Sequence, residues 1–259
     1  MARLLIIGTG RAAFHLGHAL RKAGNELMGI VGRDGTKAKD LADALGCRPF
    51  SLGTALPPAD VMVIAVSDDA IAEVAAHIPI SDAVVIHTSG ASGLDRLEPH
   101  ADRSVLWPVM TLSPGTPMDF RTIPLVIDAN TERARTTVHG LASGLSDHVT
   151  ALDHPARELV HAAAAISTNF PLYLLGAAQR LLTGKGIDPS LLMPSFAAMA
   201  AKAETLGPEA ALTGPARRGD IGTVQRHLDR LTHDPELRAA YALLSSMILR
   251  GYGHPDHER

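Results

Sequence analysis

The stretch Arg3-Leu4-Leu5-Ile6-Ile7-Gly8-Thr9-Gly10-Arg11-Ala12-Ala13-Phe14 decides the fold of this chain. Its apolar run is as long as a strand and stops at Gly8, and Gly8, Gly10 and Ala13 follow the G-x-G-x-x-A spacing. The pattern predicts a strand, a tight turn and a helix whose N-terminal N–H groups bind a dinucleotide pyrophosphate. A purely structural turn is the alternative. The predicted cofactor-binding residues of this stretch are Gly8, Thr9, Gly10, Arg11 and Ala12.

Composition and charge argue against several classes of protein. A chain of 259 residues is long enough for two domains. Its net charge of −3 and the lack of Lys/Arg clusters with interleaved aromatic residues argue against a nucleic-acid partner. Cys47 is the only cysteine, so we expect a reducing, cytoplasmic location, no intramolecular disulfide and no cysteine-based metal cluster, and we assign no metal-binding residue. No window reaches roughly 18 consecutive apolar residues, so we expect no membrane segment.

Strand and helix signals alternate through the first half of the chain. Apolar runs after the opening strand predict strands at residues 27–31, 61–66, 83–86, 104–107 and 124–127. Helical patterns lie between them, for example at residues 36–45 and 70–77. This alternation predicts an α/β fold with a doubly wound, mostly parallel Rossmann sheet. The ligand of such a sheet lies beyond the carboxyl ends of its strands.

The second half contains helix signals only. Asp153-His154-Pro155, Asp188-Pro189 and Asp234-Pro235 each place a capping aspartate just before a proline in the first helical turn, and Asp220 can cap a further helix. We therefore predict a dinucleotide-binding domain over residues 1–152 and a smaller, all-helical substrate and dimerisation domain over residues 153–259. The histidine-containing tail, residues 254–259, is expected to be frayed rather than metal-binding.

The choice of cofactor depends on the end of the second strand. NAD-binding domains carry an acidic residue about 20 positions after the glycines. In this chain the residue 23 positions after Gly10 is Arg33, and Thr36 and Lys37 follow it closely. A charge-assisted hydrogen bond from Arg33 to a 2′-phosphate contributes about 1.5–3 kcal/mol, so we predict NADP, bound by Arg33 and Lys37. Two alternatives remain: Asp34 binds a ribose hydroxyl and favours NAD, or Arg33 is only an exposed turn residue.

Two further loops are expected beside the nicotinamide. The first is Val66-Ser67-Asp68-Asp69 and the second is His87-Thr88-Ser89-Gly90. We assign cofactor binding to Val66, Ser67, Asp68, Thr88 and Ser89, and substrate binding to His87. The alternative roles are structural: Asp68 or Asp69 caps the next helix, and His87 is a satisfied residue at a strand end.

These motifs resemble those of a known family. The Gly8-Thr9-Gly10-Arg11-Ala12-Ala13, Ala65-Val66-Ser67-Asp68-Asp69 and His87-Thr88-Ser89-Gly90 stretches, and above all residues 212–220 (LTGPARRGD), look like the uncharacterised Rossmann-like proteins with a helical C-terminal domain of unknown function. That family is similar in layout to pyrroline-5-carboxylate reductase, ketopantoate reductase and deazaflavin-dependent NADP reductase. The resemblance implies a two-domain NADP-type oxidoreductase, commonly dimeric through the helical domain. One departure is Trp107-Pro108-Val109, where the family usually has His-Pro.

The helix after Asp153 holds the catalytic candidates. His161, Ala165 and Asn169 are spaced by four and eight residues, which puts them on one helical face. Related hydroxyacid dehydrogenases and ketopantoate reductase carry a lysine four residues before the asparagine, where this chain has Ala165. We predict that His161 donates the proton instead, because imidazole titrates near neutral pH, and that Asn169 orients a carbonyl or imine. Pro171 should bend this helix. A merely packed helix is the alternative.

The motif at residues 213–220 supplies two guanidinium groups before a helix start. Arg217 and Arg218 are predicted to bind a substrate carboxylate or phosphate; solvated arginines or a dimer contact are the alternatives. Together the patterns predict a homodimeric, NADP-dependent oxidoreductase that transfers a hydride between nicotinamide and a small carbonyl or imine substrate. The alternative is a non-catalytic NADP-binding regulatory or scaffold protein, favoured by the missing lysine and by the missing histidine at position 107.

Overall fold

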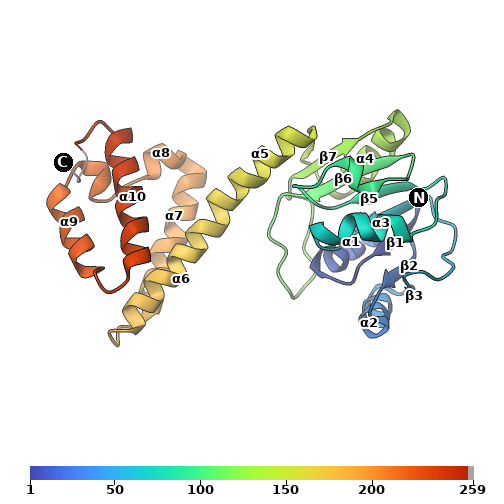
Figure 1. Ribbon diagram of the computed structural model, residues 1–259, viewed down its shortest axis with the longest axis horizontal. Helices are drawn as coiled ribbons and strands as arrows, with labels where there is room; N and C mark the ends of the chain where they lie inside the picture. The colour runs from blue at the N-terminus through green and yellow to red at the C-terminus, as the bar shows by residue number, and fades with distance from the viewer. Residues whose placement is uncertain (256–259) are drawn as a thin grey trace. The chain divides into compact units, whose positions relative to one another are not determined.

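The structure is a computed structural model that describes residues 1–255. It divides into two compact units, Met1–Ser167 and Thr168–Arg259, which we describe separately (Figure 1). All strands of the described residues lie in the first unit, and the second is helical. The last strand ends at Ala151, whereas the units divide further along, within a helical stretch. The predicted α/β fold with a helical region after it is confirmed.

One sheet of eight strands, in the order β3-β2-β1-β4-β5-β6-β7-β8, forms the first unit. The strands are β1 Arg3–Ile7, β2 Glu26–Gly32, β3 Arg48–Ser51, β4 Val61–Ile64, β5 Val84–His87, β6 Arg103–Pro108, β7 Leu125–Ala129 and β8 Val149–Ala151. All neighbours pair in parallel except β6 and β7, which are antiparallel. The sheet is therefore mostly parallel, as predicted, but the sequence patterns did not reveal its two edge strands, β3 and β8.

Helices cover both faces of this sheet. The helices of the first unit are α1 Arg11–Lys22, α2 Gly35–Leu45, α3 Ile71–His77, α4 Glu132–Leu145 and α5 His154–Ala164, with 3-10 turns η1 Asp68–Ala70 and η2 Leu94–Leu97. Leu4 and Ile6 of β1 pack in one core with α1, α2 and α4, while Leu5 and Ile7 pack in another with α3 and Leu97. Alternate residues of β1 thus face opposite sides, which explains why the whole strand is apolar.

The strand order reverses between β1 and β4, and there the chain passes very close to itself. Gly8 follows β1 with φ +131°, and a Cβ on this residue would lie 2.2 Å from the carbonyl oxygen of Ala65, just after β4. Only glycine fits this backbone conformation and this spacing. A crevice at the point where strand order reverses is the usual ligand site of open α/β sheets.

Aspartate caps begin several helices after β8, as predicted. Asp153 accepts a hydrogen bond from the Ala156 N–H (3.0 Å), and Asp220 and Asp234 cap α9 and α10. Asp188 caps a 3-10 turn that leads into α7. The elements are the π-helical turn η3 Ala165–Asn169, α6 Phe170–Thr183, η4 Pro189–Leu192, α7 Met193–Leu206, α8 Pro208–Ala211, η5 Ala216–Arg218, α9 Ile221–Arg230 and α10 Pro235–Gly251.

The π-helical turn corrects one expectation. The spacing argument for His161 and Asn169 assumed regular α-helix, but the turn at Ala165–Asn169 interrupts that geometry just before Pro171. A proline cannot donate to the carbonyl four residues earlier, so a local departure from α-helix at this place has a clear cause.

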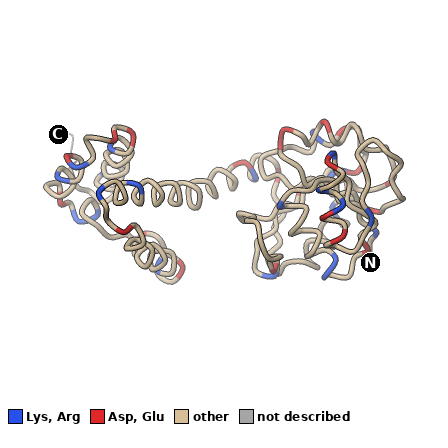
Figure 2. Tube along the Cα trace, turned by 90° about the horizontal axis from the view of Figure 1, so that it is seen from below, with Lys and Arg blue, Asp and Glu red and all other residues tan. Residues whose placement is uncertain are grey.

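Helical residues 154–183 are unusually apolar on their surface. The stretch His154–Thr183 is, by length and composition, long and apolar enough to cross a membrane, with mean hydropathy 1.2. One such helix is weak evidence, because helices of soluble proteins pass the same test. No charged residue occurs from position 159 to position 179, and Figure 2 shows this part of the trace free of charged positions.

The tail, predicted to be frayed, lies mostly outside the described residues, since residues 256–259 are not among them. His254 is described, and its Nε2 donates to the Arg217 carbonyl oxygen (3.2 Å).

Two glycine substitutions should have opposite effects on stability. Gly8→Ala should destabilise the protein by more than about 1–3 kcal/mol, because its Cβ would overlap the Ala65 carbonyl. Gly140→Ala, at an exposed position of α4 with nothing within 4 Å, should stabilise it by about 0.5–1 kcal/mol, because alanine loses less backbone entropy in a helix. Urea unfolding of both variants measures the two changes. A Gly8→Ala protein as stable as the wild type would contradict the close approach.

Candidate functional site

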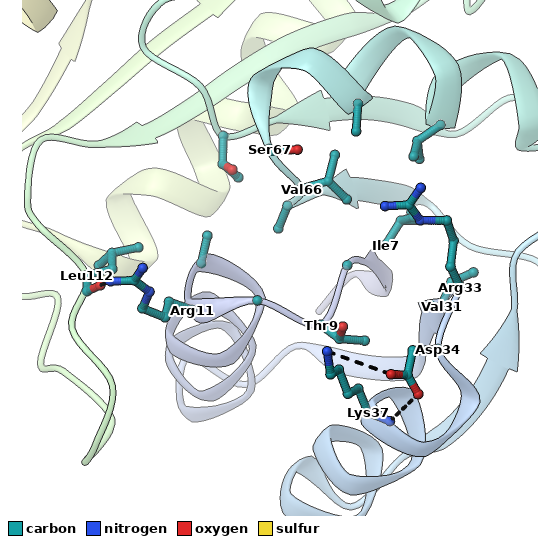
Figure 3. Close-up of a pocket in the computed structure, with 18 of the residues that line it drawn as sticks. Ile7, Thr9, Arg11, Val31, Arg33, Asp34, Lys37, Val66, Ser67 and Leu112 are labelled. Carbon is teal, nitrogen blue, oxygen red and sulfur yellow. Dashed lines mark hydrogen bonds and ion pairs between the residues drawn. The ribbon is translucent and has the colours of Figure 1, made fainter.

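A cavity of about 660 Å³ opens in the first unit where the strand order reverses (Figure 3). This volume falls within the usual range of ligand pockets, roughly 300–1,000 Å³. Ten predicted cofactor-binding residues line it: Gly8, Thr9, Gly10, Arg11, Ala12, Arg33, Lys37, Val66, Ser67 and Thr88. Two others, Asp68 and Ser89, do not. Sequence reasoning missed Leu52, Trp107, Pro108, Met110 and Leu112, which also line the cavity.

The glycine loop leaves the N-terminus of α1 open. Gly10 is the N-cap of this helix and provides no side-chain cap, and a Cβ on Gly10 would meet nothing within 4 Å. The first N–H groups of α1 therefore have room for an anion, which the positive end of the helix dipole attracts. These features fit the pyrophosphate of a dinucleotide.

The end of β2 supplies positive charge to the same cavity. Arg33 and Lys37 both line it, and Figure 3 shows Arg33 extending toward the Val66 side while Lys37 turns to Asp34. The Asp34 carboxylate caps α2, accepting from the N–H groups of Thr36 (3.0 Å) and Lys37 (3.2 Å), and lies 3.7 Å from Lys37 Nζ. Asp34 also lines the cavity, but its Oδ1 is engaged in the cap and its Oδ2 faces Lys37.

The segment after β6 is tied to α1. Arg11 donates through Nη1 to the Leu112 carbonyl (3.2 Å). The buried His15 donates from Nε2 to the Ser113 carbonyl (2.8 Å), and its Nδ1 accepts from the Met118 N–H (3.2 Å). The glycine-loop helix thus holds one wall of the cavity in place.

In the loop after β4, Val66 and Ser67 line the cavity as predicted, but the two aspartates do not lie as expected. Ser67 and Asp68 are exposed, and neither Asp68 nor Asp69 caps α3, whose N-cap is Ala70 without a side-chain hydrogen bond. Asp68 also does not line the cavity. The chain makes a 3-10 turn before α3, and this turn directs the two carboxylates to solvent.

The loop after β5 is held by buried polar groups. His87 and Ser89 are 0% and 6% exposed and do not line the cavity. His87 Nδ1 accepts from the Ser89 N–H (3.2 Å), and Ser89 Oγ accepts from the N–H groups of Ala91 and Ser92. Burial, and then the nearby Arg157 charge, lowers the pKa of His87 to about 4, so the imidazole is neutral. The predicted substrate contact of His87 and cofactor contact of Ser89 find no support in this geometry.

A buried arginine from α5 completes this loop. Arg157 has no exposed surface, and its Nη1 donates to the carbonyl oxygens of Ser92 (2.9 Å), Gly90 (3.3 Å) and Ser89 (3.5 Å). Its Nη2 donates to Asp128 Oδ2 (3.2 Å) at the end of β7. Nothing in the sequence pattern singled out this residue, because a surface helix with an arginine near its start is ordinary.

Trp107 connects the cavity to a catalytic candidate. It lies at the end of β6, lines the cavity and is 8% exposed. Its ring packs on Gly90, where a Cβ would lie 2.5 Å from Trp107 Cε2. The ring centroid is 5.7 Å from that of His161 on α5, in an edge-to-face arrangement. His161 is exposed and thus lies next to a residue of the cavity wall.

The other predicted site residues belong to the second unit. Asn169 is exposed, and Arg217 stacks over the ring of Tyr252 (3.7 Å from the guanidinium carbon to the centroid). Arg217 lines a separate cavity of about 600 Å³ with Glu209 and Tyr252. The assignments of Asn169, Arg217 and Arg218 stay predictions.

Comparisons with known proteins agree with this architecture. Residues 3–90 match the family model described as NADP oxidoreductase coenzyme F420-dependent, and residues 123–248 match that of a domain of unknown function, DUF2520. Among curated proteins, none matches the chain. The family descriptions agree with the predicted two-domain resemblance and with the predicted NADP-type cofactor.

Solved structures share the fold over nearly the whole chain. A proposed NADP oxidoreductase from Bacteroides fragilis is 28% identical, with TM-score 0.87, covering 96% of this chain and 98% of that one. A reductive aminase from Aspergillus terreus, in complex with NADPH and ethyl-5-oxohexanoate, is 15% identical, with TM-score 0.70 and coverage of 100% and 98%. A 1-pyrroline-5-carboxylate reductase from Streptococcus pyogenes is 14% identical, with TM-score 0.61 and coverage of 96% and 98%.

The last two likenesses show the fold alone, and they confirm the similarity of layout expected from the sequence. Residues 3–90 of the chain are thus similar to coenzyme F420-dependent NADP oxidoreductases, and residues 123–248 are similar to the domain of unknown function DUF2520.

Proposed function

We propose that this protein binds NADPH in the 660 Å³ cavity and reduces a small imine or carbonyl compound by hydride transfer. One observation carries the proposal: a single cavity has an open helix N-terminus and the cationic residues Arg11, Arg33 and Lys37 in its lining, and its wall residue Trp107 contacts His161. The reductive aminase and pyrroline-5-carboxylate reductase of the same fold act on such carbon–nitrogen chemistry, which supports the substrate class.

Arg33 is suited to the 2′-phosphate that distinguishes NADPH from NADH. Its side chain is exposed in the cavity, and no hydrogen bond or ion pair to it is found within residues 1–255. Asp34, the group that would favour NADH, is engaged in the α2 cap. Planar guanidinium groups bind phosphate oxygens in pairs, so Arg33 is the main selectivity residue and Lys37 adds charge.

The remaining residues have separable roles in the proposed reaction. When bound, NADPH would supply a hydride to the carbon of the C=N or C=O bond. His161 supplies the proton that adds to the nitrogen or oxygen, giving an amine or an alcohol. Trp107 covers the adjoining wall and excludes water. Asn169, Arg217 and Arg218 keep their predicted roles in orienting and binding the substrate.

The competing proposal is a non-catalytic NADP-binding regulatory or scaffold protein. The chain has no lysine between Lys39 and Lys185 and carries Trp107 where the family that its sequence resembles usually has histidine. The contact between Trp107 and His161 favours the enzyme, because it puts a group able to transfer protons beside the cavity. The cytoplasm is the proposed location in either case.

We also propose that the protein forms a homodimer through its helical unit. In that unit α6 buries only Ala177 and α7 buries no residue, while Phe170, Tyr173 and Met199 are about half exposed or more. The exposed apolar side chains lie on several helices. If one helix spanned a membrane, the lipid would cover only the side chains of that helix. A second copy of the chain can cover several helices at once, as obligate dimers do.

Arg33→Ala should abolish the preference for NADPH over NADH. The wild type should bind NADPH about ten- to a hundredfold more tightly, the value of one charge-assisted hydrogen bond, and the variant should bind both cofactors alike. Calorimetric titration of each cofactor measures this. Arg96→Ala, which removes an exposed arginine outside the cavity, is the control. Equal affinities in the wild type would refute the selectivity.

His161→Asn should slow turnover and leave NADPH affinity unchanged. Loss of a general acid lowers kcat by about 10²–10⁴-fold. NADPH consumption is followed against a panel of cyclic imines, ketone–amine mixtures and keto acids, and the affinity is titrated separately. Tight NADPH binding by the wild type with no turnover of any member of the panel would support the regulatory protein instead.

Tyr173→Glu should dissociate the dimer, since it buries a charge in the proposed apolar interface. Sedimentation equilibrium should give twice the chain mass for the wild type and the chain mass for the variant. Ile80→Glu, equally exposed but in the first unit, should remain dimeric. A monomeric wild type that needs detergent to stay in solution would favour a membrane over a second copy.

A further inference from the structure

We propose that Arg157, paired with Asp128, is a positioning residue that fixes the loop after β5 and, through it, the Trp107 wall of the cofactor cavity. The inference rests on the proposed function, because it assigns that wall to the nicotinamide side of the cavity. Arg157 touches neither the cavity nor its ligand, and it acts through the backbone of the loop.

The hydrogen bonds of Arg157 go mainly to backbone. One nitrogen, Nη1, lies within 3.5 Å of three carbonyl oxygens of residues 89–92, and the other, Nη2, holds Asp128. A fully buried guanidinium is costly unless it is paired and hydrogen-bonded. One carboxylate at Nη2 and three carbonyl dipoles at Nη1 offset part of this cost, while the buried Nε has no hydrogen-bond partner among the described residues. These contacts tie the loop backbone to α5.

A second contact from α5 acts on the same loop. His154 Nε2 donates to the Ala91 carbonyl (3.0 Å), so two side chains one turn apart hold consecutive loop carbonyls. The N-terminal turn of α5 is thereby attached to the loop after β5, and Asp128 attaches it to β7.

The loop in turn determines where Trp107 lies. The Trp107 ring packs against Gly90, and a Cβ there would overlap the indole. The Gly90 carbonyl is one of those that Arg157 binds, and His161 follows Arg157 by one helical turn. Arg157 therefore positions both side chains of the Trp107–His161 contact. It positions the Trp107 ring through Gly90 and the His161 imidazole through α5.

The protein provides its own probe for this arrangement, because Trp107 is its only tryptophan. Arg157→Lys keeps the charge but presents one compact ammonium group, which cannot hold Asp128 and three carbonyls together. Arg157→Met removes the charge and keeps the length. In the cofactor-free protein, we expect both variants to make Trp107 more accessible to quenching by acrylamide. We also expect the NADPH concentration that gives half-maximal quenching of Trp107 fluorescence to rise about tenfold.

The matched control is Arg133→Lys. Arg133 of α4 also ties a carboxylate, Asp102, to a carbonyl, that of Asp82, but it does not line the cavity or contact the loop. Circular dichroism establishes that each variant is folded. If Arg157→Met fails to fold, Arg157→Lys and Asp128→Asn still test the inference. A folded Arg157→Lys protein with Trp107 accessibility and NADPH quenching equal to those of Arg133→Lys would overturn it.

The two proposals fail in different ways. If wild-type Trp107 is shielded from acrylamide and Arg157→Lys exposes it, while NADPH quenches neither protein, the positioning role stands and the proposed function fails. If NADPH quenches both proteins alike and acrylamide reaches Trp107 equally in both, the cofactor site stands and the positioning role fails.

Discussion

The close approach of the backbone after β1 to the backbone after β4 is the constraint on which the rest of the structure depends. Gly8 can come this near to the Ala65 carbonyl only because it lacks a side chain. The approach brings the N-terminus of α1 and the β4 loop to one crevice, at the point where the strand order reverses. All groups that line the cavity, from the glycine loop to Trp107, are positioned around this contact.

Much of the fold was predictable because its central strands are buried on both faces. Such strands are continuous apolar runs, and the glycines and capping aspartates between them mark turns and helix starts. The edge strands β3 and β8 were missed for the same physical reason. Arg48–Ser51 and Val149–Ala151 are short and largely exposed, so burial imposes no apolar pattern on them.

The cofactor half of the candidate site was predictable, and the rest was less so. The glycine loop and Arg33 lie close to strands in sequence, so local pattern places them. Arg157 and Trp107 are 50 residues apart and meet through the loop at Gly90, which no local pattern encodes. Likewise, the π-helical turn at Ala165–Asn169 departs from the regular α-helix on which the shared face of His161 and Asn169 was predicted.

The attachment of α5 to the loop after β5 has a consequence for folding during synthesis, because the loop depends on residues that are made later. Among residues 1–255 the last strand ends at Ala151, but the hydrogen bonds to the carbonyls of residues 89–92 come from His154 and Arg157, which follow it. A nascent chain that has emerged only as far as β8 has every strand of its sheet and still lacks these donors. Synthesis must therefore continue into α5 before the loop after β5 can obtain these hydrogen bonds.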